Sequence, residues 1–142
     1  MGRARASKRK IRVLIADREG VFRLGLKKLL GLEDDLRVVA QADDPSQLPG
    51  LAAKFKPDVL YVQAEIAGED PEGLFARVKQ AFSRARIIIT ASSLGEGDAV
   101  RFVKAGASGV ILKSVDPAMF VKSARKVVEN EVWLPKGQFA EL

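Results

Sequence analysis

The sequence contains no cysteine and no histidine among its 142 residues. These absences exclude disulfide bonds, zinc sites built from cysteine and histidine, thiol nucleophiles, and any phosphoryl or proton transfer that needs an imidazole. No apolar run reaches the roughly 18 residues of a membrane span, and the charged amino terminus lacks the apolar segment of a signal peptide behind it. The sequence therefore predicts a cytoplasmic protein without a membrane-spanning segment.

Aromatic residues are scarce, at 6% of the chain, whereas apolar residues make up 47% and charged residues 30%. This composition is typical of a soluble globular domain and differs from that of a disordered chain. The length suits one domain with a sizeable core. We expect a single folded unit over residues 11–135, preceded by a flexible basic arm, residues 1–10, and followed by the start of a linker or tail, residues 136–142.

The excess of positive charge lies at the amino terminus. Six of the 24 lysines and arginines fall within the first 12 residues, which contain no acid, so 18 basic and 18 acidic residues balance in the remainder. Such an arm is either a solvated tail or a weak contact for the phosphates of nucleic acid, and it has no aromatic residue to read bases.

Apolar runs suited to strands alternate five times with segments of helical period. The continuous apolar character of the runs, including three consecutive isoleucines at 87–89, indicates a sheet buried on both faces. Strands joined by helices in this way form parallel sheets with right-handed crossovers. The predicted class is α/β, a doubly wound sheet with strands at 11–17, 36–42, 58–63, 86–90 and 109–113.

Several residues mark expected helix ends. Gly31 suits a left-handed cap after the first helix, and Ser46 suits the N-cap of a short second helix that carries Pro49 in its first turn. Asp116 and Pro117 together predict the start of the last helix.

In a doubly wound sheet, ligands bind at the carboxyl ends of the strands. The first strand there lacks the glycine-rich turn of a dinucleotide site, which argues against nicotinamide and flavin cofactors. The residues at this edge are instead Asp17-Arg18-Glu19, Gln63-Ala64-Glu65, Thr90-Ala91-Ser92 and Lys113-Ser114.

Four stretches, at 13–17, 57–60, 106–109 and 112–113, read VLIAD, PDVL, GASG and LK. In order and spacing they resemble the receiver domain of response regulators. The segment EVWLP at 131–135 is similar to the end of receivers that precede a LuxR-type helix-turn-helix domain. The resemblance implies a flavodoxin-like sheet with strand order 2-1-3-4-5.

Receivers of this family carry a phosphoryl group on an aspartate that ends the third strand, beside Mg²⁺ held by acids that end the first. By position, Asp17 matches the first acid and Lys113 matches the lysine that contacts the phosphoryl group. However, Gln63 stands at the position of the phosphoacceptor, and Arg18 stands at that of the second acid. A carboxamide is not a competent nucleophile here, and a cation 4 Å from Mg²⁺ costs up to ~8 kcal/mol at an effective dielectric of 20. We expect neither metal nor cofactor, and an ion pair between Asp17 and Lys113.

The hydroxyl that contacts the phosphoryl group in this family has two possible counterparts. Counting back from Gly106 without a gap selects Ala91, whereas one extra loop residue selects Thr90. Val110 replaces the aromatic residue that often follows the GASG turn. Glu65 is a displaced alternative acceptor, and we expect it in a mobile loop without metal support.

The sequence thus predicts a degenerate receiver without enzymatic activity, acting in signal transduction and transcriptional regulation through a protein partner or a homodimer. Alternatives are a functional phosphoacceptor that uses Glu65 and nucleic-acid contact by the basic arm. A helix-turn-helix needs roughly 50 to 60 residues, but only seven follow Pro135. DNA binding would then fall to a domain absent from this sequence, which is either a piece of a longer regulator or a stand-alone receiver.

Overall fold

Five strands form one parallel sheet in the order β2-β1-β3-β4-β5. Both the predicted class and the predicted strand order are confirmed. Each predicted strand is present, and its bounds differ by at most one residue at either end. The strands are β1 (Ile11–Ala16), β2 (Leu36–Ala42), β3 (Val59–Gln63), β4 (Arg86–Ala91) and β5 (Gly109–Leu112).

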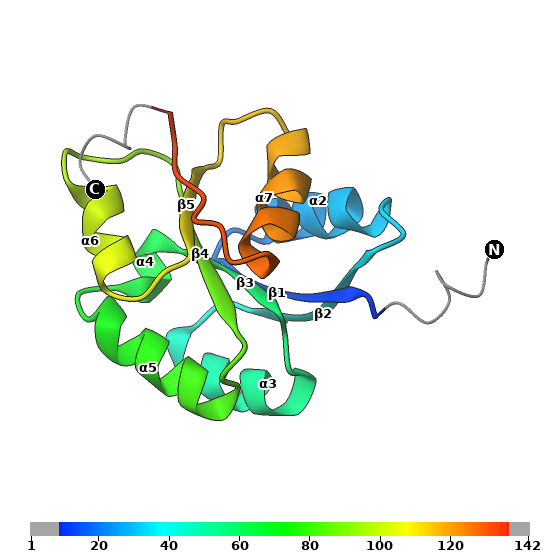
Figure 1. Ribbon diagram of the computed structural model, residues 1–142, viewed down its shortest axis with the longest axis horizontal. Helices are drawn as coiled ribbons and strands as arrows, with labels where there is room; N and C mark the ends of the chain where they lie inside the picture. The colour runs from blue at the N-terminus through cyan, green and yellow to red at the C-terminus, as the bar shows by residue number, and fades with distance from the viewer. Residues whose placement is uncertain (1–8, 137–142) are drawn as a thin grey trace.

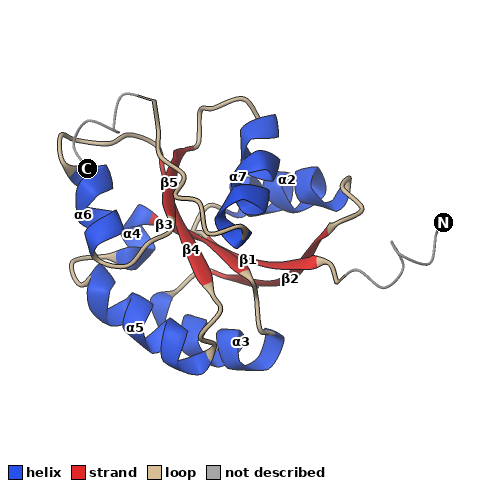
Figure 2. Ribbon diagram, in the orientation of Figure 1, coloured by secondary structure: helices blue, strands red, loops and turns tan. Residues whose placement is uncertain are grey.

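The computed structural model describes residues 9–136, so most of the predicted arm and of the predicted tail lies outside the described residues. Helices cover both faces of the sheet, as Figures 1 and 2 show. One face carries α2 (Gly20–Gly31) and α7 (Ala118–Val128). The other carries α3 (Leu48–Phe55), α4 (Ala64–Ala67), α5 (Pro71–Ala81) and α6 (Asp98–Lys104), with a 3₁₀ turn, η1 (Pro45–Gln47), before α3.

Side-chain alternation along the strands divides the core into two clusters. In β1, Leu14 packs toward α3 and α5, whereas Ile15 packs toward α2 and α7. The central strands β1, β3 and β4 are almost entirely buried, as their continuous apolar sequences require. Tyr61 is buried among them because its hydroxyl donates to the backbone oxygen of Phe120, 2.6 Å away. Both faces of these central strands are therefore closed to solvent.

Two of the predicted helix caps are wrong. Gly31 is still helical, and the chain continues through Leu32 in right-handed backbone with φ −76°, so no left-handed cap forms. Ser46 lies inside η1, where Asp44 is the N-cap and accepts a hydrogen bond from the Ser46 N–H. At α7 the Asp116 carboxylate accepts from the Ala118 N–H at 2.9 Å, so Asp116 binds the start of the helix, although the N-cap residue is Pro117. The chain adds a short 3₁₀ turn before α3, which helical period alone does not reveal.

The segment after β3 is more ordered than its sequence suggests. Residues predicted as a mobile loop form the short helix α4, with Glu65 exposed on it. Gly68 ends this helix with φ +67°, a positive value that glycine adopts without the strain a side chain would bring. Pro71 is buried at the start of α5. In place of the predicted loop, the chain after Gln63 forms one helical turn that packs on the sheet.

The segment that follows α7 returns to the free edge of β5. The Trp133 N–H donates to the Ser108 oxygen at 3.0 Å, and the Trp133 oxygen accepts from the Val110 N–H at 2.8 Å. Gly109 lies between these two bonds, and a Cβ there would lie 2.8 Å from the Trp133 oxygen. Glycine is therefore needed for this close approach.

Candidate functional site

Four polar residues lie at the carboxyl edge of the sheet on the face covered by α2 and α7. Asp17 directly follows β1 and Lys113 directly follows β5, whereas Gln63 and Thr90 are paired neighbours in β3 and β4. Because side chains alternate along strands, all four share the face of Ile15, Tyr61, Ile88 and Ile111. Asp17, Gln63, Thr90 and Lys113 therefore gather at one site on this edge of the sheet.

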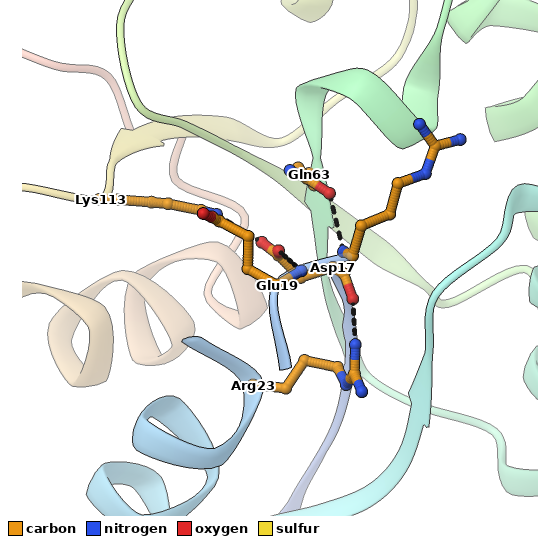
Figure 3. Close-up of polar contacts among 6 residues, drawn as sticks. Asp17, Glu19, Arg23, Gln63 and Lys113 are labelled. Carbon is orange, nitrogen blue, oxygen red and sulfur yellow. Dashed lines mark hydrogen bonds and ion pairs between the residues drawn. The ribbon is translucent and has the colours of Figure 1, made fainter. Parts of the chain in front are cut away.

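The Asp17 carboxylate is fully buried and holds the crevice together. Its Oδ1 accepts from the Glu19 N–H at 2.8 Å, and its Oδ2 lies 2.8 Å from the Lys113 Nζ. Figure 3 shows Lys113 reaching across from β5 toward Asp17 and Glu19. The predicted ion pair between Asp17 and Lys113 is confirmed.

Lys113 is shared between two carboxylates, since its Nζ also forms an ion pair with Glu19. Burial by itself lowers the pKa of Lys113, but hydrogen bonds to Asp17 and Glu19 outweigh this effect and raise the pKa above the ordinary lysine value. The ammonium also lies 4.3 Å from the centre of the Phe22 ring. Lys113 is thus held as a fixed cation inside the crevice.

Gln63 uses its amide oxygen to fix the loop after β1. The Oε1 accepts from the backbone N–H of Arg18 at 2.8 Å, and the side chain is almost buried. Arg23, from α2, donates to the backbone oxygen of Asp17 on the other side of the same loop (Figure 3). The backbone of residues 17–19 is therefore tied to both β3 and α2.

Arg18 itself is exposed. The pKa of the Asp44 carboxyl lies below its usual value, first because Ser46 donates hydrogen bonds to it and in smaller part because of the positive charge of Arg18. The Lys113 ammonium, rather than Arg18, is the cation paired with Asp17.

The structure distinguishes Thr90 from Ala91 as the counterpart of the hydroxyl residue that contacts the phosphoryl group in receiver domains. Thr90 pairs with Gln63 and is buried on the crevice face, whereas alternation directs Ala91 to the opposite face. The Thr90 Oγ1 has no hydrogen-bond partner among the described residues. The alignment with one extra loop residue, which selects Thr90, agrees with this placement.

Sequence reasoning placed Glu19 at this edge without a role, and it did not select Arg23. The two residues are one helical turn apart, and the Arg23 N–H donates to the Glu19 oxygen at 3.1 Å.

Within residues 9–136, no group of three or more acidic side chains is arranged to hold a metal ion. None of the described helices is long and apolar enough to cross a membrane.

The strand order and the helices on both faces define a doubly wound α/β domain with a cluster of charged residues at the carboxyl edge of its sheet. The family model for the response regulator receiver domain matches residues 13–125. The chain belongs to this family.

Curated relatives are full-length regulators with similar sequences. The nitrate/nitrite response regulator protein NarL of Escherichia coli is 26% identical over 125 residues, which cover 88% of this chain and 58% of that protein. The homologous protein of Haemophilus influenzae is 27% identical over 125 residues, covering 88% of this chain and 60% of its own length. The chain thus spans about three fifths of the length of these relatives.

Solved structures show the same fold. A LuxR-family two-component response regulator from Aurantimonas has a TM-score of 0.80 and 25% identity, covering 93% of this chain and 94% of that one. The signal receiver domain of a NarL regulator from Mycobacterium tuberculosis has a TM-score of 0.79 at 24% identity, covering 87% of this chain and all of that one. The receiver assignment thus rests on sequence and fold together.

Proposed function

We propose that this chain is a receiver that signals without being phosphorylated, through contacts with a protein partner or a second copy of itself. The observation that carries the proposal is the amide of Gln63 at the end of β3. An amide oxygen that accepts from the Arg18 N–H is a neutral structural acceptor, not a nucleophile for phosphorus. The geometry supports a crevice that keeps its shape while lacking the acyl-phosphate chemistry.

The residues present do not fit a divalent cation. Magnesium needs oxygen ligands free to coordinate it. Here the Lys113 ammonium is paired with the carboxylates of Asp17 and Glu19. The internal ammonium of Lys113 thus occupies the carboxylate oxygens that an exchangeable metal ion would need. We therefore assign no step to a metal ion.

The likeness to NarL-type regulators supports a place in two-component signalling and transcriptional regulation. The chain covers only part of these relatives, so any DNA binding of a helix-turn-helix kind would belong to a further domain. The proposed role of this domain is to bind a second copy of itself or a protein partner, and it has no catalytic activity.

Phosphorylation by acetyl phosphate tests the proposal directly. We expect the wild-type chain, incubated with acetyl phosphate and Mg²⁺, to keep its intact mass. The double variant Arg18→Asp and Gln63→Asp restores the two missing acids, and we expect it to gain one phosphoryl group. This variant is the positive control for the assay.

The competing function is phosphorylation on a displaced carboxylate. Glu65 is exposed on α4, directly after Gln63 and Ala64. A phosphoryl gain by the wild-type chain that Glu65→Gln abolishes would establish this alternative and refute the proposal. A gain that persists in Glu65→Gln would refute both.

A further inference from the structure

A second charged site lies at the opposite, amino-terminal edge of the sheet. A cleft of about 210 Å³ opens there between the start of β1, the start of β3 and the turn that leads into β4. Four cations line it, Arg9, Lys10, Arg84 and Arg86, against the single carboxylate of Asp58. Asp58 directly precedes β3 and so lies at this edge. The cleft thus carries a clear excess of positive charge.

The one carboxylate is already used within the cleft. Asp58 Oδ1 lies 2.7 Å from the Arg9 guanidinium, and Oδ2 accepts from the Arg12 N–H at 2.9 Å. Asp58 thus compensates Arg9, and the charges of Lys10, Arg84 and Arg86 are left over.

The contacts of the two remaining guanidinium groups are with uncharged groups. Arg86 donates to the Arg84 oxygen and to the Asn130 side-chain oxygen, each at 2.7 Å. The Arg84 guanidinium lies 5.4 Å from the centre of the Phe82 ring. The pKa of the nearby Lys79 is lowered, first by burial and second by the charge of Arg86. Neutral hydrogen bonds fix the direction of a guanidinium without cancelling its charge, so the site is preorganised for an anion.

The size and lining of the cleft narrow the class of anion. It is smaller than the roughly 300–1,000 Å³ of pockets that enclose small molecules, which favours part of a larger polyanion. No aromatic ring lines it, so it offers no stacking platform for unpaired bases. Guanidinium groups without base-reading partners suit phosphates of a duplex backbone.

More positive charge precedes the cleft residues in the sequence. Just before the cleft, the chain carries Arg3, Arg5 and Lys8 and no acid. A linear run of cations is complementary to the regular charge of a phosphodiester backbone, whereas an acidic protein surface presents few evenly spaced anions. The arm and the cleft are thus continuous along the chain.

We propose that the cleft formed by Arg9, Lys10, Arg84 and Arg86 binds the phosphate backbone of duplex nucleic acid without regard to sequence. The contact is independent of the receiver crevice, which lies at the other edge of the sheet. It would hold this domain against DNA whatever other domain reads the sequence.

The test measures binding of the full chain to a labelled duplex of arbitrary sequence over a range of salt concentrations. Each phosphate contact contributes a slope of about 0.9 in log K against log salt. We expect Arg84→Gln with Arg86→Gln to reduce the slope by about 1.8 and to weaken binding roughly 10-fold to 100-fold near 50 mM salt. Arg84→Lys with Arg86→Lys should keep the slope.

The matched control is Arg101→Gln with Lys104→Gln, which removes the same charge from exposed positions on α6 that line a separate groove. A urea unfolding midpoint close to that of the wild type shows that the arginine variants are folded. The single variant Arg84→Gln, at an exposed residue, is a milder change than the double variant. Equal weakening by the control pair, or no duplex binding near 50 mM salt, overturns the proposal. Tighter binding of an acidic peptide than of the duplex would assign the cleft to a protein partner and overturn it as well.

Discussion

Replacing Lys113 with methionine should destabilise the fold because it leaves the Asp17 carboxylate without its cation. Asp17 is fully buried, and its Oδ2 lies 2.8 Å from the Lys113 Nζ, whose side chain is only 12% exposed. Removing one partner of a buried ion pair costs about 3–5 kcal/mol. The Glu19 N–H still binds Oδ1, so we expect the lower end of this range, about 3 kcal/mol.

Urea unfolding followed by circular dichroism measures this loss as a lower midpoint with an unchanged m-value. The double variant Asp17→Asn with Lys113→Met removes both charges, so we expect it to regain more than half of the lost stability. Lys122→Met, at an exposed position on α7, is the matched control and should leave the midpoint almost unchanged. A loss below about 1 kcal/mol for Lys113→Met, or a double variant no more stable than it, would refute the buried-pair argument.

Gly109→Ala should lower the free energy of unfolding by about 1–3 kcal/mol through overpacking, since the new Cβ would lie 2.8 Å from the Trp133 oxygen. Gly25→Ala makes the same change in α2 with no heavy atom within 4 Å, so it should raise stability in the same urea assay, and a loss of equal size at both sites would contradict the steric explanation. The raised pKa of Lys113 stabilises the fold fully below the ordinary lysine value of 10.5, and this contribution is lost as the pH rises through the folded value. The stability difference between wild type and Lys113→Met should therefore shrink above pH 10.5, and a difference that grows there would reverse the assigned sign.

The strands were predictable because burial on both faces leaves a direct record in the sequence, as at Ile87, Ile88 and Ile89. The ion pair between Asp17 and Lys113 was predictable for a related reason, since parallel strands bring their carboxyl ends to one edge. The ends of the helices were harder to predict from the sequence. The cap at Asp44, rather than Ser46, depends on a 3₁₀ turn that no apolar period signals.

Hydrogen bonds to backbone groups could not be predicted from the sequence. The bond from the Arg18 N–H to the Gln63 Oε1 depends on the path of the loop after β1, and that path leaves no pattern in residue type. The same holds for Arg23, whose partner is the main-chain oxygen of Asp17. The order of α4 was missed because a single helical turn is too short to show periodicity.

The strand-like pairing of Trp133 beside Gly109 has a consequence for self-association. An outermost strand offers unpaired amide and carbonyl groups that can recruit a strand from another molecule and start aggregation. On β5 the Val110 N–H is already taken by the protein's own main chain, as is the neighbouring Ser108 oxygen. The polypeptide thus caps its own sheet, which protects the molecule against open-ended polymerisation along this border.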